Sequence, residues 1–238
     1  MTAHPGAVLF DMDGTLVDTE PLWYAAEYDV MVALGGTWDE QDQAACLGGP
    51  VHRTVAYMAD RLTDPMPADE LGDLLMTTME RHIAAADLQW LPGARDLVLQ
   101  VRELGLPTAL VSASWRRIIA AVEAKVIATV GDVFDVVVAG DEVAATKPHP
   151  EPYLTAAAVL GRPAGDCLAL EDSPTGLASA IAAGCRVVAV GAPAAGPGTG
   201  VATVPDLAGH SVATLWALAQ AAIRQPGPSP SAPRTRRQ

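Results

Sequence analysis

The chain has 238 residues, of which 50% are hydrophobic and 18% charged, and its formal net charge is -13 at pH 7. This length and composition supply enough apolar side chains for a packed core, which excludes an intrinsically disordered protein. The negative charge disfavours nucleic acid and anionic membrane surfaces as partners, and no apolar run is long enough to cross a bilayer. We therefore expect a globular protein that binds neither.

The cysteines and the first residues bear on the compartment. Cys46, Cys167 and Cys185 are odd in number and lack the spacing of a metal site, which favours buried thiols in a reducing cytoplasm. The start, MTAHPGAVLF, has neither a basic segment nor a long apolar segment, so it does not predict an export signal. We expect a cytoplasmic protein and a monomer.

Residues 7–10, Ala-Val-Leu-Phe, form an apolar run typical of a strand buried on both faces in a parallel sheet. Asp11 and Asp13 follow this run, at the end of the strand where open α/β sheets place their ligand sites. Two carboxylates at one strand end repel each other unless a cation or a proton relieves the repulsion. The pair therefore predicts a hard divalent metal such as Mg2+. Taken alone, the segment is equally compatible with a capped turn.

Residues 18–89 contain helical patterns and nothing strand-like. The first helix is expected to begin near Asp18 or Thr19 and to end at Gly35. Two further helices are marked by apolar residues at helical spacing: Val51, Val55, Met58 and Leu62, then Leu71, Leu74, Leu75 and Met79. A structureless loop of this length is uncommon inside a compact domain. We therefore predict a helical cap, residues 18–89, inserted after the first strand.

From residue 90 onward, strand-like and helical segments alternate, which is typical of a parallel sheet covered by helices. The expected strands are 107–111, 136–138, 167–170 and 186–190. The expected helices are 94–104, 115–125, 152–160, one from Pro174 that stops at Gly184, and 211–223. We predict an α/β fold with a Rossmann-like, doubly wound parallel sheet as its core, residues 1–17 and 90–223. The tail, residues 224–238, is rich in Pro, Ser and Arg and is expected to be disordered.

Polar residues also end two of the later strands. Ser112 is the first polar residue after the second strand, and Glu171 and Asp172 stand at the end of the fourth. Lys147, in the loop before a helix, supplies a cation. Each has an ordinary explanation when taken alone. Ser112 could be a turn hydroxyl, Glu171 and Asp172 could be acids at the start of a helix, and Lys147 could be a surface charge. Because strand ends of a doubly wound sheet converge in one crevice, the set predicts a single site with the first acid pair.

As a set, these motifs resemble the haloacid dehalogenase superfamily, in its branch of phosphatases and β-phosphoglucomutases with a helical cap. The motifs are DMDGT at 11–15, Ser112 in VSAS, Lys147 in KPHPEPY and Glu171-Asp172 in EDSPTG. The resemblance spans about residues 8–190. It implies a Rossmann-like core, a helical cap, Mg2+ and phosphoryl transfer through an aspartyl-phosphate.

The resemblance implies a role for each of the acids. Asp11 is the expected nucleophile, and Asp13 is expected to protonate the leaving oxygen and later to deprotonate the attacking water. Mg2+ is expected to be held by Asp11, the backbone carbonyl of Asp13, and Asp172, with Glu171 as a further ligand directly or through water. An acid at the position of Asp13 favours phosphate esters over haloacids as substrates.

Other polar residues are expected to bind the substrate. Lys147 would balance the charge of the nucleophile and the transferring group, while Thr15 and Ser112 would donate hydrogen bonds to phosphoryl oxygens. The further candidates for substrate binding are Glu20, His52, Arg53 and Arg116. If the adjacent His52 and Arg53 face the crevice, they could hold a second anionic group, and an outward orientation is the alternative.

The leading hypothesis is a Mg2+-dependent phosphatase that hydrolyses a small phosphorylated metabolite, a sugar phosphate. A sugar phosphomutase similar to β-phosphoglucomutase is an alternative, because the same aspartyl-phosphate can be passed to a sugar hydroxyl if water is excluded. A single basic pair, His52 and Arg53, would bind a second phosphate only weakly, which favours hydrolysis over the mutase reaction. A non-catalytic phosphate-binding module is the third hypothesis, and an intact nucleophile and acid argue against it.

Overall fold

The structure is a computed structural model that describes residues 4–191 and 200–224. The tail predicted for residues 224–238 lies outside the described residues except for Arg224, which ends the last helix. None of the helices in the described part of the chain combines the length and apolar character that a membrane crossing needs.

Six parallel strands form one sheet in the order β5-β4-β1-β6-β7-β8. The strands are β1 (Ala7–Phe10), β4 (Thr108–Val111), β5 (Val136–Val138), β6 (Cys167–Glu171), β7 (Arg186–Val190) and β8 (Ala202–Val204). The predicted fold class is confirmed, and each predicted strand is present. The short edge strand β8 was not predicted, because three residues with one exposed threonine give no clear apolar run.

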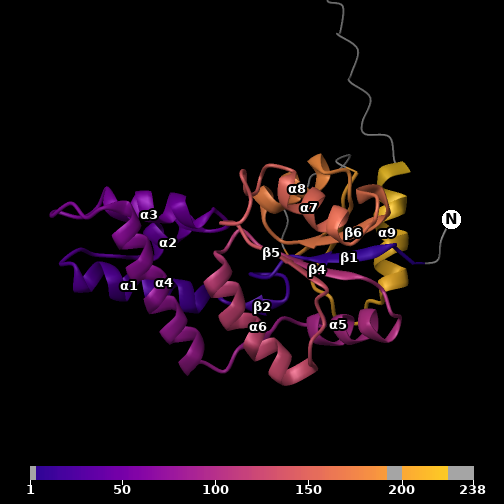
Figure 1. The fold of residues 1–238 in the computed structure, drawn as a ribbon, viewed down its shortest axis with the longest axis horizontal. Helices are drawn as coiled ribbons and strands as arrows, with labels where there is room; N and C mark the ends of the chain where they lie inside the picture. Colours follow the sequence, from indigo (N-terminus) through magenta and orange to yellow (C-terminus); the bar gives the residue numbers. More distant parts are fainter. Residues whose placement is uncertain (1–3, 192–199, 225–238) are drawn as a thin grey trace, which may run out of the picture.

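Helices cover both faces of this sheet (Figure 1). They are α5 (Ala94–Glu103), α6 (Arg116–Val130), α7 (Glu151–Val159), α8 (Pro174–Ala182) and α9 (Val212–Arg224), with a 3-10 turn at Ala164–Asp166. Successive residues of a strand point to opposite faces, so Val8 and Phe10 join a core cluster with α5, α6 and α9. Ala7 and Leu9 join a second cluster with α7 and α8. The central strand is therefore buried on both faces.

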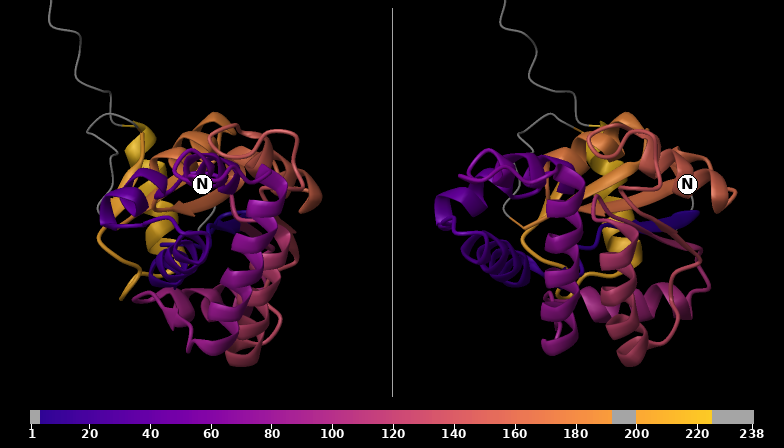
Figure 2. Two further views of the ribbon diagram at one scale, coloured as in Figure 1. Left: turned by 90° about the vertical axis from the view of Figure 1, so that its left-hand side faces the viewer. Right: turned by 60° about the vertical axis from the view of Figure 1, so that its left-hand side comes forward.

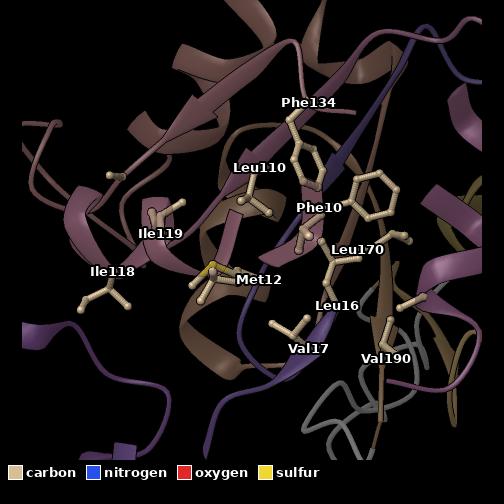
Figure 3. Close-up of a cluster of buried hydrophobic side chains, with 14 of the residues drawn as sticks. Phe10, Met12, Leu16, Val17, Leu110, Ile118, Ile119, Phe134, Leu170 and Val190 are labelled. Carbon is tan, nitrogen blue, oxygen red and sulfur yellow. The ribbon is translucent and has the colours of Figure 1, made fainter. Parts of the chain in front are cut away.

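The larger cluster continues from the sheet toward the chain segment that leaves β1 (Figure 3). The rings of Phe10 and Phe134 meet edge to face with their centroids 6.2 Å apart. Met12, which stands between Asp11 and Asp13, and Leu16, which follows the motif, are each 1% exposed. These apolar anchors fix the loop that carries the two acids.

The four helices that follow β1, between residues 20 and 85, form the helical cap, to one side of the sheet (Figures 1 and 2). They are α1 (Glu20–Ala33), α2 (Glu40–Cys46), α3 (Val51–Ala59) and α4 (Ala68–Ala85). Where the chain leaves and re-enters the sheet domain, β2 (Val17–Asp18) pairs antiparallel with β3 (Gln89–Trp90). The division predicted at residues 18–89 stays a prediction, and this pairing lies at both of its ends.

Two helices differ from the prediction. Helix α2 was missed, although the sequence carries a capping signal: Asp39 accepts hydrogen bonds from the backbone of Gln41 and Asp42, and Asp42 accepts one from the backbone of Asp39. Helix α6 continues to Val130, whereas we expected it to end at residue 125, because Val126 and Val130 extend its buried face.

Candidate active site

The carboxyl ends of three adjacent strands, β4, β1 and β6, meet at one edge of the sheet, as predicted. Asp11 follows β1, Ser112 follows β4, and Asp172 follows Glu171 at the end of β6. A cavity lies over this edge, and its walls come from the strand ends on one side and from α1, α2 and α3 on the other. Residues distant in sequence are thus brought together beneath the cap.

Lys147 is the buried cation of this site, with a side chain that is only 3% exposed. Its Nζ donates hydrogen bonds to Asp11 Oδ1 at 2.6 Å, to the Val111 carbonyl at 2.8 Å and to Glu171 Oε1. Burial alone would lower the pKa of Lys147, but the two carboxylates outweigh it and raise that pKa. The ammonium group therefore stays protonated and holds Asp11 in place.

Glu171 is engaged through both of its carboxylate oxygens. Oε1 accepts hydrogen bonds from Lys147 and from the Tyr153 hydroxyl at 2.6 Å, while Oε2 accepts from the Ser173 hydroxyl at 3.3 Å. Gly176 lies against this carboxylate so closely that a Cβ there would come within 2.0 Å of it. This position therefore excludes any side chain, and Glu171 acts chiefly as the partner that fixes Lys147.

Asp11, Glu171 and Asp172 each offer a carboxylate oxygen within 4.8 Å of the others. Asp11 Oδ2 is buried and has no hydrogen-bond partner among the described residues. Burial, followed by repulsion from Glu171, raises the pKa of Asp11 well above its usual value and that of Asp172 to about 7. Gly14, at φ 78°, allows the first loop to approach Asp172, because a Cβ there would lie 2.1 Å from Oδ2. An orphaned oxygen among mutually repelling carboxylates fits a hard divalent cation.

Asp13 lies apart from this cluster, within hydrogen-bond distance of hydroxyl groups. Thr19 Oγ1 donates to its Oδ1, while Ser114 Oγ at 2.9 Å and Ser112 Oγ at 3.3 Å donate to its Oδ2. The Asp13 side chain is thus oriented by Thr19, at the junction of β2 and α1, and by the two serines that follow β4. We did not assign this role to Thr19 or Ser114 from the sequence. Thr19 directly precedes Glu20, which we did select, and Ser114 is the second serine of VSAS, two residues after Ser112.

The predicted phosphate-binding hydroxyls differ in position. Ser112 lines the cavity, and its Oγ also accepts a hydrogen bond from the backbone of Ser114 at 3.0 Å. Thr15 is fully buried, its hydroxyl has no hydrogen-bond partner, and it is not part of the cavity wall. The predicted contact of Thr15 with phosphate therefore stays a prediction.

Of the four further candidates for substrate binding, the structure brings Glu20 to the cavity wall and leaves three outside it. His52 is exposed and Arg53 donates to the Ala45 carbonyl, so the basic pair does not form part of the wall. The Arg116 guanidinium donates through Nε to Glu142 Oε1 at 2.7 Å. None of these three side chains therefore borders the cavity as the described residues form it.

The cap side of the cavity carries Trp23, which we also considered from the sequence because it lies near the start of the cap, and three residues that we did not select: Glu27, Gln43 and Thr54. Glu27 is 4% exposed, and its Oε2 accepts a hydrogen bond from the Trp38 indole N–H at 3.1 Å. Burial raises the pKa of Glu27 to about 7, although the indole hydrogen bond opposes this. Nothing in the sequence indicated that Glu27 is buried, because helical spacing alone does not show which polar residue of α1 faces the rest of the cap.

Comparison with known proteins agrees with the fold. A family model described as haloacid dehalogenase-like hydrolase matches residues 8–190. Protein CbbY of Rhodobacter capsulatus is 38% identical over 193 residues, which cover 76% of this chain and 83% of that protein. Hexitol phosphatase B of Escherichia coli K12 is 35% identical over 197 residues, covering 79% and 85% respectively.

Two crystal structures of CbbY from Rhodobacter sphaeroides are also similar, one in complex with phosphate and one of a mutant in complex with xylulose-(1,5)bisphosphate. They are 27% and 26% identical to this chain, each has a TM-score of 0.81, and each comparison covers 89% of this chain and 99% of the other. The likeness therefore includes both the sheet and the helical cap.

Proposed function

The chain belongs to the haloacid dehalogenase-like hydrolase family, and from this premise we propose that it is a Mg2+-dependent phosphatase of small phosphorylated metabolites, sugar phosphates in particular. The observation that carries the proposal is the state of Asp11. One carboxylate oxygen is held by Lys147, and the other is buried without a partner at the cavity. A carboxylate fixed in this way is suited to nucleophilic attack on phosphorus.

In the proposed reaction, the carboxylate of Asp11 attacks the phosphorus atom and the ester P–O bond breaks. Asp13 gives its proton to the departing oxygen, which leaves as an alcohol. The aspartyl-phosphate is then hydrolysed by a water molecule whose proton returns to Asp13, and inorganic phosphate leaves. Ser112 donates a hydrogen bond to a phosphoryl oxygen, while Lys147 keeps a positive charge beside the nucleophile throughout.

Mg2+ would be held by Asp11, Asp172 and the backbone carbonyl of Asp13, and when bound it would neutralise the charge shared by the nucleophile and the phosphate. The repelling carboxylates and the orphaned oxygen of Asp11 support this assignment. Glu171 would contribute through water, since both of its oxygens already accept hydrogen bonds.

The similarity to hexitol phosphatase B, and to a CbbY structure that holds phosphate, supports hydrolysis of sugar or polyol phosphates. A phosphomutase would need a binding site for a second phosphate, and the described residues of the cap wall include no cation that could form one. The complete pair of Asp11 and Asp13 argues against a non-catalytic phosphate-binding module.

The test is release of phosphate from p-nitrophenyl phosphate and from a panel of sugar phosphates. We expect turnover with Mg2+, loss of turnover with EDTA, and recovery when Mg2+ is added in excess. Asp11→Asn should lower kcat by about 10³-fold or more while the far-UV circular dichroism spectrum is retained. Asp96→Asn, at a side chain that is 86% exposed on α5, is the matched control and should act as wild type. Activity that is indifferent to chelation or to Asp11→Asn would rule out the proposal.

A further inference from the structure

The cap wall of the cavity has a distinct charge pattern. α1 contributes Glu20 and Glu27, α2 contributes Gln43, and α3 contributes Thr54. Among the described residues that line the cavity, the only cation is Lys147, which lies on the opposite wall in contact with two carboxylates. The part of a substrate that faces the cap thus meets hydrogen-bonding groups and negative charge.

Glu27 is the most unusual member of this wall, because it is buried in the cap and yet borders the cavity. Its carboxyl group accepts the indole N–H of Trp38 through Oε2, and no other hydrogen bond reaches it from the described residues. Carboxyl oxygens inside proteins are normally satisfied by several donors, but Oε1 of Glu27 accepts no hydrogen bond from the described residues. A ligand in the cavity can supply one.

Two kinds of ligand group can be compared at this position. A sugar or polyol hydroxyl is a hydrogen-bond donor and an acceptor, so it can bind Glu27 in either protonation state and can also bind Gln43 and Thr54. A phosphate dianion has no proton to donate and would be placed beside two acidic side chains, with no cation among the described residues of the cap wall to neutralise it. The wall therefore favours hydroxyls and disfavours a second phosphate.

We propose that Glu27, together with Gln43 and Thr54, is the specificity determinant of this protein and selects phosphate monoesters with an uncharged polyhydroxyl end, while excluding bisphosphates. This inference rests on the proposed phosphatase function and extends it to a substrate class. It also separates this chain from the CbbY relative whose mutant crystal structure holds xylulose-(1,5)bisphosphate.

The test compares kcat/KM, measured with Mg2+, for three phosphate esters. Fructose 6-phosphate and fructose 1,6-bisphosphate differ by one phosphoryl group, and p-nitrophenyl phosphate carries no hydroxyl on its leaving group. We expect wild type to prefer fructose 6-phosphate over the bisphosphate by about 10-fold or more. Preference for the bisphosphate would overturn the inference.

Two variants assign the preference to the cap wall. Glu27→Leu removes the acceptor at similar volume and should lower the ratio of kcat/KM on fructose 6-phosphate to that on p-nitrophenyl phosphate by about 10-fold or more. Glu70→Leu, at an exposed acid in the first turn of α4, is the matched control and should leave this ratio as in wild type. Gln43→Lys adds a cation to the wall and should shift selectivity toward the bisphosphate by about 5-fold or more.

The outcomes separate this inference from the proposed function. If p-nitrophenyl phosphate is hydrolysed but neither Glu27→Leu nor Gln43→Lys changes the selectivity, the specificity assignment is wrong and the phosphatase proposal stands. If wild type hydrolyses none of the three esters or any other in the panel, both are wrong. Gln43→Lys affects a half-buried residue, so it provides a test even if Glu27→Leu does not fold.

Discussion

The two walls of the cavity differ in how their charges are arranged. On the sheet wall, Lys147, Asp11 and Glu171 are buried, and the Lys147 ammonium group donates hydrogen bonds to both carboxylates. On the cap wall, Glu27 has one bond to Trp38 and borders the cavity with an incompletely satisfied carboxyl group. In the function that we propose, the sheet wall performs the chemistry, and the cap wall recognises the rest of the substrate.

The largest expected effect comes from breaking the sheet wall at Lys147. Lys147→Met leaves two buried carboxylates without their cation, so we expect stability to fall by about 3–5 kcal/mol and turnover to fall by about 10³-fold or more. Urea unfolding and phosphate release measure the two effects.

Lys125→Met is the matched control for this substitution. In the part of the chain that the structure describes, Lys125 Nζ donates to two backbone carbonyls, those of Ala84 at 3.0 Å and Ala86 at 2.8 Å, outside the cavity. We expect a stability loss of no more than about 1 kcal/mol and turnover close to that of wild type. A Lys147→Met protein as stable and active as this control would show that the ion cluster does not organise the site.

The next effect concerns the cap wall and depends on pH. The pKa of Glu27 is raised from 4.5 to about 7 in the folded protein, so its ionisation should destabilise the fold as pH rises through this range. This pKa shift corresponds to about 3 kcal/mol of stability lost when Glu27 is fully ionised, and Glu27→Gln removes the ionisation and so the loss. Between about pH 5 and pH 8, wild type should therefore lose about 2 kcal/mol of stability relative to the variant.

Urea unfolding of both proteins at each pH measures this difference. Cys46, the nearby thiol, should not interfere, because burial raises its pKa from 9.0 and it stays neutral over this range. A pH dependence identical in the two proteins would mean that Glu27 is ionised without penalty and that the cap wall is more solvated than its burial indicates.

The smallest effect is expected at Arg116, which the sequence placed at the substrate. Its guanidinium is paired with Glu142, at side chains 38% and 42% exposed, and does not border the cavity. Exposed pairs contribute little, so Arg116→Ala should change stability by about 1 kcal/mol or less and kcat/KM by no more than about 2-fold. A loss of about 10-fold or more in kcat/KM on sugar phosphates would move Arg116 into the binding site.

Most of the sheet wall could be predicted from sequence because its acids and Ser112 stand at strand ends, whereas Lys147 comes from the loop before α7. Apolar runs identify the strands, and parallel topology brings Asp11, Ser112 and Glu171 to one edge whatever the loops between them do. The cap wall could not be predicted in this way. Whether Glu27 or Arg53 faces the cavity depends on how four helices pack, and helical periodicity alone did not reveal α2 or the buried orientation of an acid.

The central claim is that the carboxylate of Asp11 accepts the phosphoryl group. In Asp13→Asn, p-nitrophenyl phosphate can still react, because nitrophenolate leaves without a proton, but hydrolysis of the intermediate loses its base. We predict that acid quenching followed by peptide mass spectrometry will find one phosphoryl group on the peptide that contains Asp11, and specifically on that residue. A phosphoryl group on another carboxylate, or none while nitrophenolate is released, would contradict the claim.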